Sequence, residues 1–530
     1  MRLKLEHCLL YAVTDTAWLR GQTLAQQVES ALRGGVTMVQ LREKHLTGEA
    51  LEQEAEEILA LCRQYGVPLL INDDVLLAKK IGADGVHVGQ SDMAAEQARE
   101  ILGPDAIIGV TARTVEQARA AEAAGADYLG SGAVFGTSTK ADAKPMEHAY
   151  FQEICESVSI PVVAIGGITA DNIRQLQGRK MHGFAIVSGI FAADDIEAQT
   201  KKLWQAAQEL CMPSAAPVLA EKVRQMRPVV QCITNIVTVN DCANALLAAG
   251  ASPTMAHHPQ EMEDFAQVTD ALVCNLGASE SYEAMLRAAA LTAEKGHPVV
   301  IDPVGCASSF FRRKICMELI DAVRSSEPAP GSCCLCIRGN ASEIRALAEH
   351  RNTGRGVDET PSVTPAAPGK GAVSELPETS ELPETLELPE ALELTKTSEL
   401  PETSDISDSS GSSESPKTLL KSMPGEQLAL QTGAIVITSG ATDYVTDGIR
   451  SYAVQGGTPW MARVTGTGCM LSSLLGSYLA AETSALSAAC CCSRMKVCGE
   501  EAAEKTAREE GGTGTFHIRL MDALSGPIGH

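Results

Sequence analysis

Short apolar runs alternate with helix-like stretches through the first 211 residues of the chain. The helix-like stretches, such as 48–65 and 114–124, are rich in Ala, Glu and Gln at helical spacing. Short apolar strands that are each followed by a helix are typical of a parallel sheet buried on both faces. Eight such units in about 200 residues predict a closed (β/α)8 TIM barrel. The expected strands are 8–14, 36–42, 67–72, 84–88, 106–111, 127–132, 161–166 and 183–188.

A second α/β pattern begins at Arg227, after a stretch at 212–217 that contains Pro and Ala and indicates a domain boundary. We therefore expect one domain at 1–212, a linker at 213–226 and a second domain at 227–528. The expected strands of the second domain are 229–234, 271–275, 298–302, 333–338 and 434–438.

Low-complexity sequence interrupts the second domain at about 355–422. Five hexads run from Ser374 to Thr403: SELPET, SELPET, LELPEA, LELTKT and SELPET. Proline in most hexads excludes a continuous helix. High charge with little bulky apolar content leaves no core to bury, so we expect a disordered surface loop.

Composition narrows the classes of function. Hydrophobic residues make up 45% and charged residues 21% of the chain, which is an ordinary globular balance. No apolar run approaches the roughly 20 residues that span a bilayer, and residues 1–13 lack the cleavage site of a signal peptide. The formal charge of −24 and the lack of a basic stripe argue against nucleic-acid binding. We expect a cytoplasmic protein that acts on small molecules, without nucleic-acid or membrane partners.

The 17 cysteines do not predict a metal site. The clusters at 333–336 and 490–492 lie in apolar or Ala-rich stretches and lack the spacing of zinc ligands. Reduced cysteines that act as small buried hydrophobes are the better interpretation in a cytosolic chain.

Polar residues of the first domain gather where the predicted strands end. In a TIM barrel these ends meet on the one face that carries active sites. The pooled cations, carboxylates, hydroxyls and glycine turns suit a magnesium-bound diphosphate and a second phosphate. Each of these residues alone could have a purely structural role; a strand-end Asp, for example, is often a helix N-cap. Their joint placement at successive strand ends is what favours a binding site. The segments are 40–44, 72–74, 87–92, Thr111, 135–140, 166–167 and 187–188.

These residues resemble the thiamine-phosphate synthase family across 8–200. The matching motifs are YAVTD at 11–15, QLREK at 40–44, IND at 71–73, GVHVGQSD at 85–92, TSTK at 137–140 and VVAIGGI at 162–168. The family commonly has Ser where Thr111 stands and Pro where Gly136 stands. The resemblance implies a pyrimidine diphosphate held by Gln40, Leu41, Arg42, Glu43, Lys44, Asn72, Thr111 and Lys140. It implies Mg²⁺ on Asp73 and Asp92, and a thiazole phosphate on Thr137, Ser138, Thr139, Gly167, Val187 and Ser188.

The implied reaction needs no protein nucleophile. Mg²⁺ with Arg42, Lys44 and Lys140 would neutralise the charge that grows on the departing diphosphate. The thiazole nitrogen would then attack the aminopyrimidine methylene cation. Two rivals for this domain are a thiazole tautomerase and a non-catalytic thiamine-binding module. Both are expected to lack part of the diphosphate and Mg²⁺ residues.

The second domain contains a glycine-rich turn, VTGTGC at 464–469, followed by a helical run at 470–481. Such a turn aims free backbone N–H groups and the positive helix end at an anion. Two further strand ends, RGNASE at 338–343 and DPVG at 302–305, add an arginine and carboxylates. Together they predict a phosphoryl-transfer site without a Walker A loop.

The second domain resembles the hydroxyethylthiazole kinase family, of ribokinase-like fold, over about 228–350 and 425–526. The motifs are CITNIVT at 232–238, ANALLAAGASPTMA at 243–256, RGNASEI at 338–344, DYVTDG at 443–448 and VTGTGC at 464–469. The resemblance implies that Met255 and Gly466 contact the thiazole alcohol and that Arg338 and Ser439 contact ATP. It also implies a water-mediated Mg²⁺ role for Glu343, for which helix capping is the alternative. The family loop DPVGAGA reads DPVGCAS from Asp302 here, so one of its glycines is missing, and the family Thr is Ser439.

Cys469 occupies the position at which many ribokinase-like enzymes carry an Asp base. A thiol at a helix N-terminus is expected to have a lowered pKa, so Cys469 is a candidate to polarise the substrate hydroxyl. The alternative is that Cys469 only packs, while positioning and electrostatics provide the rate.

The two domains support one another, because the predicted kinase product is a predicted synthase substrate. We therefore expect a bifunctional transferase that uses ATP and Mg²⁺ and makes thiamine phosphate. One alternative is a synthase with a decayed kinase domain, and another is a thiamine-pathway sensor that binds without turnover. A homo-oligomer formed through the kinase domain is also expected.

Overall fold

The structure is a computed structural model, and it describes residues 2–136, 145–328, 334–349 and 423–526. The first domain is a closed barrel of eight parallel strands in sequence order, with β1 paired to both β2 and β8. The predicted barrel is confirmed, and each expected range contains its observed strand. The strands are β1 (Leu10–Val13), β2 (Met38–Leu41), β3 (Leu69–Asn72), β4 (Gly85–Val88), β5 (Ile107–Thr111), β6 (Tyr128–Gly132), β7 (Val162–Ile165) and β8 (Gly183–Ile186).

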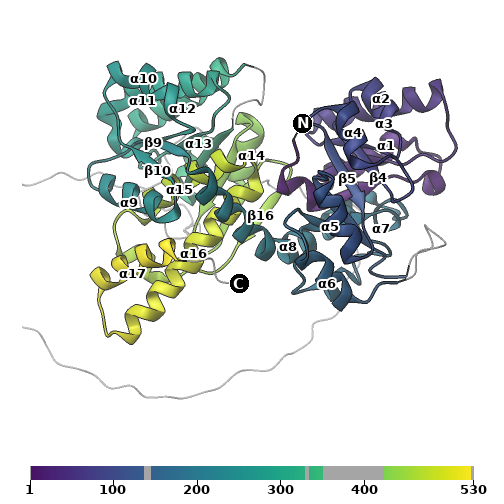
Figure 1. Cartoon of the computed structure of the whole chain (residues 1–530). Helices are drawn as coiled ribbons and strands as arrows, with labels where there is room; N and C mark the ends of the chain where they lie inside the picture. The colour runs from purple at the N-terminus through teal and green to yellow at the C-terminus, as the bar shows by residue number, and fades with distance from the viewer. Residues whose placement is uncertain (1, 137–144, 329–333, 350–422, 527–530) are drawn as a thin grey trace, which may run out of the picture. The chain divides into compact units, whose positions relative to one another are not determined.

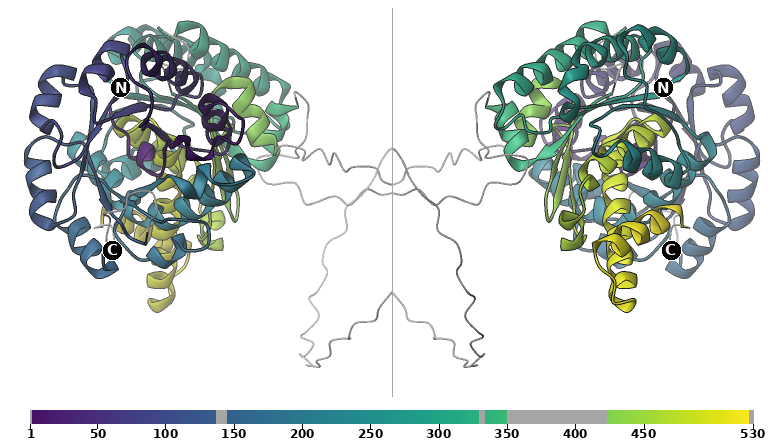
Figure 2. Two further views of the ribbon diagram at one scale, coloured as in Figure 1. Left: turned by 90° about the vertical axis from the view of Figure 1, so that its right-hand side faces the viewer. Right: turned by 90° about the vertical axis from the view of Figure 1, so that its left-hand side faces the viewer.

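Helices cover the outside of this barrel (Figures 1 and 2). Strand residues that face outwards, such as Ala12 and Val39, pack against the helices, and those that face inwards, such as Tyr11 and Met38, fill the barrel. Side-chain caps begin several helices, for example Thr23 at α1 and Thr114 at α5. The helices are α1 (Leu24–Arg33), α2 (Glu49–Gln64), α3 (Val75–Ile81), α4 (Ala95–Leu102), α5 (Val115–Ala123), α6 (His148–Glu156) and α7 (Ser188–Phe191).

The residues expected to form a linker, 213–226, are instead helical. They are the second half of α8, a single helix from Ile196 to Met226 that contains Pro213 and Pro217. Proline removes one helical hydrogen bond and crowds the preceding turn, which is why the sequence indicated a break. Buried side chains along the helix, from Leu203 to Val223, supply packing that offsets this cost.

The second domain is built on one eight-stranded sheet of order β10-β9-β11-β12-β13-β14-β15-β16. All five strands expected from the sequence occur, and the α/β fold is confirmed. Three short strands were not expected, and two of them, β15 and β16, are antiparallel. The strands are β9 (Val229–Ile233), β10 (Ser252–Thr254), β11 (Ala271–Asn275), β12 (Val299–Asp302), β13 (Leu335–Asn340), β14 (Ile435–Ser439), β15 (Asp443–Thr446) and β16 (Ser451–Val454).

Both faces of this sheet are covered because its strands are apolar on both sides. On β11, Leu272 faces one buried cluster and Val273 faces the other. One face packs against α10 (Met262–Val268), α11 (Tyr282–Glu294), α12 (Phe310–Ser326), α13 (Ala341–Ala348) and α14 (Pro424–Thr432). The other packs against α9 (Val239–Ala249), α15 (Thr467–Ala481), α16 (Ala485–Arg508) and α17 (Thr513–Ser525). Short 3-10 helices are η1 (Leu5–Cys8), η2 (Thr16–Trp18), η3 (Ile173–Leu176), η4 (Pro259–Glu261), η5 (Leu276–Ser281) and η6 (Pro459–Arg463).

Every cysteine that the structure describes is unbridged, and all of them except the partly buried Cys469 are buried, in agreement with the sequence interpretation. Within the described ranges, no helix is long and apolar enough to cross a membrane. The predicted low-complexity insert lies outside the described residues.

Candidate active sites

Two cations predicted to bind diphosphate meet one carboxylate at the carboxyl ends of β1 and β2. Arg42 Nη1 and Lys44 Nζ lie 3.5 and 3.0 Å from Asp15 Oδ2. Burial alone raises the pKa of Asp15, but hydrogen bonds from Lys44 and the Ala17 amide, with both nearby cations, hold it below its ordinary value. Asp15 was not identified from the sequence as a site residue, although it ends the YAVTD motif. It positions both cations at the mouth of the barrel.

The carboxyl ends of β2 and β3 carry two amide side chains, Gln40 and Asn72, and the carboxylate of Asp73 follows them. Gln40 Nε2 donates to Asn72 Oδ1 at 2.7 Å, and Asn72 Nδ2 donates to Asp73 Oδ2 at 2.5 Å. Asp73 adopts a left-handed conformation with φ of 62°, which L-residues rarely occupy without a constraint. The helix cap belongs to its neighbour Asp74, which accepts from the Leu77 amide. The structure therefore separates Asp73 from the capping role considered for a strand-end Asp.

Asp92 lies in the loop after β4, the strand that pairs with β3, and its Oδ2 accepts from the Gly89 amide at 2.8 Å. The described residues contain no preformed group of three or more metal-binding His, Cys, Asp or Glu side chains. Mg²⁺ commonly takes one or two carboxylates together with substrate phosphates and water. The exposed carboxylates of Asp73 and Asp92 fit this mode of binding.

Two residues of the QLREK motif have side chains that are engaged within the domain. The Leu41 side chain is buried in the layer between strands and helices, so only its backbone is available at the barrel mouth. Glu43 Oε1 accepts from the amides of Lys44, His45 and Leu46, at 2.7, 2.5 and 3.3 Å. Glu43 therefore shapes the turn that carries Lys44.

Thr111, at the end of β5, contacts a histidine inside the barrel. Its Oγ1 lies 3.0 Å from His87 Nε2, and His87 Nδ1 lies 2.9 Å from the hydroxyl of Tyr128. The side-chain amide of Gln90 donates through Nε2 to the Thr111 carbonyl at 2.6 Å. His87 lay in the polar strand-end segment 87–92 without a role of its own, and Tyr128, within the predicted strand 127–132, was not identified as a site residue.

The residues predicted to hold the thiazole phosphate lie near the ends of β7 and β8. Gly166 and Gly167 have φ of 101° and 66°, and a Cβ on Gly167 would lie 2.3 Å from the Gly136 carbonyl oxygen. Glycine is therefore needed both for the turn and for this close approach. Val187 precedes and Ser188 begins the short helix α7. The predicted residues Thr137, Ser138, Thr139 and Lys140 lie outside the described residues.

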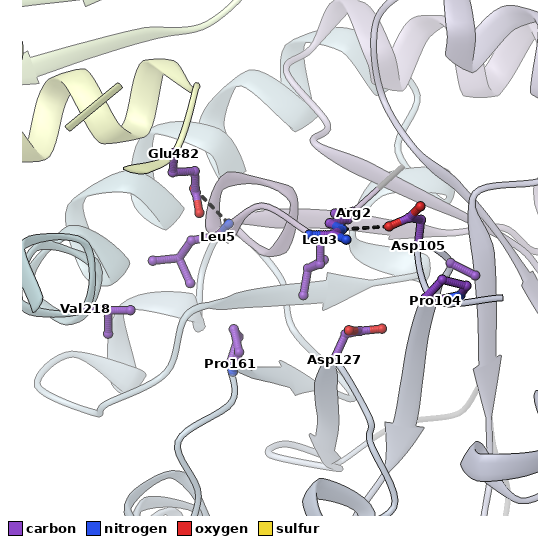
Figure 3. Close-up of a pocket in the computed structure, with 10 residues that line it drawn as sticks. Arg2, Leu3, Leu5, Pro104, Asp105, Asp127, Pro161, Val218 and Glu482 are labelled. Carbon is purple, nitrogen blue, oxygen red and sulfur yellow. Dashed lines mark hydrogen bonds and ion pairs between the residues drawn. The ribbon is translucent and has the colours of Figure 1, made fainter. Parts of the chain in front are cut away.

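A separate cavity of about 370 Å³ opens at the amino ends of the barrel strands (Figure 3). Asp105, Asp127 and Pro161 line it, and each precedes a strand. Arg2 bonds to Asp105 at 2.7 Å. Catalytic groups of TIM barrels lie at the opposite strand ends, so this cavity is distinct from the candidate synthase site.

In the second domain, Arg338 connects two predicted site regions. Its Nε donates to Ser439 Oγ at 2.9 Å, and its Nη1 lies 3.8 Å from Asp302 Oδ2. A Cβ on Gly468, in the first turn of α15, would lie 2.7 Å from Arg338 Nη1. The absence of a side chain at Gly468 therefore lets the guanidinium lie close to the start of α15. The Arg338 charge and the helix N-terminus both favour an anion there.

Two asparagines that sequence analysis missed hold Cys469. Asn275 Nδ2 donates to Asp302 Oδ2 at 2.9 Å and to Cys469 Sγ at 3.2 Å. Asn235 Nδ2 lies 3.6 Å from the same sulfur. Burial raises the pKa of the Cys469 thiol, and the Asp302 charge raises it further. The expected lowering was wrong, because desolvation and a nearby anion outweigh the helix end. The available signal was that Asn235 follows one predicted strand and Asn275 ends another.

Glu343 is both a helix cap and a loop anchor. It forms a capping box with Asn340, and its Oε1 also accepts from the Gly305 amide at 2.8 Å. Burial, followed by the Asp302 charge, raises its pKa to about 7. Among the described residues, Asp302 Oδ1 is buried and has no hydrogen-bond partner. Two buried carboxylates, one with an unsatisfied oxygen, fit a divalent cation. Cys306, in the loop that lacks one family glycine, is buried and its Sγ lies 3.6 Å from the Glu343 carbonyl.

A cavity of about 400 Å³ adjoins this cluster and is lined by Arg338, Ser439 and the start of α15. Lys496, from α16, also lines it and donates to the carbonyl of Gly456 at 3.1 Å. One turn later, Glu500 accepts from the Gly457 amide at 2.7 Å. Helix α16 thus holds the Gly456–Gly457 turn at the cavity wall through two side chains, one turn apart.

The two residues predicted to contact the thiazole alcohol lie at separate elements. Met255 follows β10 and is partly buried against the core. Gly466 caps α15 with φ of 90°, and a Cβ there would lie 2.8 Å from Thr238 Cγ2. The left-handed turn and this contact explain why glycine stands at 466.

Comparison with known proteins assigns each domain. Residues 10–190 match the family model for thiamine monophosphate synthase. Residues 220–374 and 406–527 match the model for the hydroxyethylthiazole kinase family. The two matches cover the two folds described above.

Relatives with both domains match along most of the chain. The probable thiamine biosynthetic bifunctional enzyme of Schizosaccharomyces pombe is 31% identical over 495 residues, covering 88% of this chain and 83% of the relative. The thiamine biosynthetic bifunctional enzyme of Saccharomyces cerevisiae is 29% identical, covering 97% of this chain and 94% of the relative. The thiamine-phosphate synthase of Ruminiclostridium cellulolyticum is 46% identical, covering 38% of this chain and 96% of the relative. The chain therefore belongs to the family of bifunctional thiamine biosynthetic enzymes, with an N-terminal thiamine-phosphate synthase domain and a C-terminal hydroxyethylthiazole kinase domain.

Proposed function

We propose that the kinase domain phosphorylates 4-methyl-5-(2-hydroxyethyl)thiazole with ATP. The synthase domain then joins the thiazole phosphate to 4-amino-2-methyl-5-hydroxymethylpyrimidine diphosphate and releases diphosphate. The observation that carries this proposal is the pairing of two complete family matches in one chain, each with charged residues gathered at its strand ends.

In the synthase, Arg42 and Lys44 bind the diphosphate and stabilise the negative charge that develops as it leaves. Asp15 holds both cations in place, at 3.5 and 3.0 Å. Asp73 and Asp92 would hold Mg²⁺, which supplies further charge neutralisation on the diphosphate. Gln40, Asn72 and Thr111 orient the pyrimidine, with Lys140 assigned to the diphosphate. Gly167, Val187 and Ser188 hold the thiazole phosphate with the 137–139 segment, in the phosphate position common to TIM barrels.

In the kinase, Arg338 and Ser439 bind the ATP phosphates beside the first turn of α15. The free backbone N–H groups of that turn stabilise negative charge on the transferred phosphoryl group. Asp302 and Glu343 would hold Mg²⁺, which supplies charge neutralisation on ATP. Met255 and the Gly466 backbone define the pocket for the thiazole alcohol.

Cys469 orients the alcohol rather than acting as a thiolate base. Its thiol pKa is raised, so the thiol stays protonated near neutral pH. Asn275 and Asn235 fix the sulfur at the start of α15. Phosphoryl transfer depends mainly on positioning and electrostatic stabilisation, so strong base assistance is not required.

One coupled assay tests the proposal. The purified full chain receives the thiazole alcohol, ATP, Mg²⁺ and the pyrimidine diphosphate, and thiamine phosphate is measured. Turnover that requires thiazole phosphate in place of the alcohol would favour a synthase with a decayed kinase. Ligand binding without any product would favour a sensor. Assembly through the kinase domain and a cytoplasmic location also stay predictions, which sedimentation of the full chain and microscopy of a tagged chain test.

A further inference from the structure

Six polar side chains inside the barrel form one unbroken line of hydrogen bonds. Besides the contacts of Asn72, His87 and Thr111 given above, Tyr11 donates to Gln40 Oε1 at 2.8 Å, and Tyr128 donates to the Tyr11 hydroxyl at 3.0 Å. Every successive donor–acceptor distance is between 2.7 and 3.0 Å. We call this set the interior hydrogen-bond chain: Asn72, Gln40, Tyr11, Tyr128, His87 and Thr111.

The barrel backbone is shaped to hold the rings of this chain. A Cβ on Gly109 would lie 2.2 Å from the Tyr128 ring, and one on Gly130 would lie 3.0 Å from the His87 ring. Both glycines lie within strands, where glycine ordinarily costs stability. The absence of side chains at these positions makes room for the two rings.

One carboxylate sets the direction of the whole line. Asp73 Oδ2 accepts at 2.5 Å from Asn72, so the Asn72 Nδ2 faces Asp73 and its Oδ1 faces Gln40. Because Asp73 Oδ2 accepts this bond, the Nδ2 side of the Asn72 amide must face it, which fixes the amide orientation. Gln40 must then present Nε2 to Asn72 and Oε1 to Tyr11. The orientation of each amide follows from that of the one before.

The same direction continues through the rings. Tyr11 gives its proton to Gln40, so it accepts from Tyr128. Tyr128 has then used its own proton, so its oxygen accepts from His87 Nδ1–H. In the neutral ring, Nε2 is left unprotonated and accepts from Thr111. Burial raises the pKa of both tyrosines, which keeps their hydroxyl protons in place.

The consequence for a ligand concerns Thr111 alone. Its hydroxyl proton is committed to His87, so the oxygen offers only lone pairs to the pyrimidine site. We propose that the interior hydrogen-bond chain makes Thr111 an obligate acceptor and thereby selects a pyrimidine with a ring amino group over one with a ring carbonyl. His87 and Tyr128 are positioning residues in this inference, which rests on the proposed synthase function.

Nitrogen NMR of the full chain tests the predicted tautomer directly. With ¹⁵N-labelled histidine, the His87 resonances are assigned by their loss in His87→Gln. Protonated Nδ1 and unprotonated Nε2 are expected. An Nε2–H tautomer or a doubly protonated ring would overturn the inference. The tautomer is read from the unmodified protein, and the variant serves only to assign the resonances.

Substrate selectivity tests the functional consequence. The ratio of kcat/KM for the 4-amino pyrimidine diphosphate to that for its 4-oxo analogue is measured for the wild type, Tyr128→Phe and Tyr150→Phe. Tyr128→Phe breaks the line and frees Thr111 to donate, so the ratio should fall by about tenfold or more, the scale of one hydrogen bond. Tyr150 is partly buried on α6 outside the line, and its variant should keep the ratio.

An unchanged ratio in an active Tyr128→Phe enzyme would overturn the inference. Failure of the proposed function looks different, because the wild type would then form no thiamine phosphate from the 4-amino substrate. If Tyr128→Phe loses all activity, Tyr11→Phe breaks the same line one bond earlier and takes its place. A ratio retained in that variant would equally reject the idea.

Discussion

The ammonium of Lys496 lies 3.6 Å from the Asp443 carboxylate, and both residues line the kinase cavity. The same ammonium donates to the carbonyls of Gly440, Ala441 and Gly456, at 3.2, 2.9 and 3.1 Å. One buried cation therefore joins the two loops that border the proposed nucleotide site. Such a cation positions the loops without contacting the reacting atoms.

Lys496→Met should raise the KM for ATP by about tenfold or more while changing kcat much less, because loss of loop positioning weakens binding. The variant leaves Asp443 buried and unpaired, so the Tm should also fall. Lys505→Met, at a surface pair with Glu501 on the same helix, is the matched control. An unchanged KM for ATP in Lys496→Met would contradict the positioning role of Lys496. The synthase rate should not change in either variant.

The sequence predicted the fold well because each strand is a short apolar run with its own helix. It did not predict β15 and β16, which are four-residue strands whose apolar pattern is interrupted by an exposed residue in each. Continuity of α8 was also missed, since the effect of Pro213 and Pro217 is local and the packing that offsets it is tertiary. Strand-end residues such as Arg42 and Arg338 were identified because the carboxyl ends of parallel strands lie together at one edge of a barrel or sheet.

Residues that act through another side chain were not given a role from the sequence. Asp15, His87 and Lys496 owe their roles to partners far away in the sequence, such as Lys44, Thr111 and Gly456. The raised pKa of Cys469 was missed for the same reason. Helix position is visible in the sequence, whereas desolvation and the Asp302 charge arise only from packing.

Asp92→Asn should abolish synthase turnover and leave the kinase rate unchanged. The amide can still accept from Gly89, so the loop keeps its hydrogen bond while the proposed Mg²⁺ site loses a charge. The control is Asp105→Asn, at the opposite end of the barrel, which should retain both activities. Equal loss of both activities in Asp92→Asn would point to misfolding, and a normal synthase rate would reject the ligand role.

Deleting 375–405 and joining the ends with a short Gly/Ser linker should leave both activities nearly intact. The kinase family match includes 220–374 and 406–527 and omits the residues between them. Loop length costs little free energy, roughly 0.6 kcal/mol per doubling. Rates of both reactions and the yield of folded protein are compared with the full chain. A large drop in kinase rate would show that the segment contributes to that domain.

Glu343 should make the metal-free protein less stable as the pH rises. Its pKa is about 7 in the folded chain and 4.5 ordinarily, so the folded state binds the extra proton between these values. Stability is then lost as pH rises through this window, by about 3 kcal/mol in total. The Glu343→Gln variant lacks this titrating group, so it should not lose this contribution. Measured in EDTA, the Tm of the variant should rise relative to that of the wild type as the pH goes from 5 to 8. Parallel Tm profiles would contradict the raised pKa.

Cys469 offers the sharpest test of the kinase mechanism. Because its thiol stays protonated near neutral pH, Cys469→Ala should lower kcat by less than about tenfold, below the 10²-fold or more expected for loss of a general base. Cys469→Asp should be more harmful, since a second carboxylate would be desolvated beside Asp302. In the wild type, kcat should stay flat from pH 7 to 9. A thiolate base would instead give a rate that climbs with pH, an inactive Ala variant and a working Asp variant. That combination would restore Cys469 as the base and reject its role in orientation.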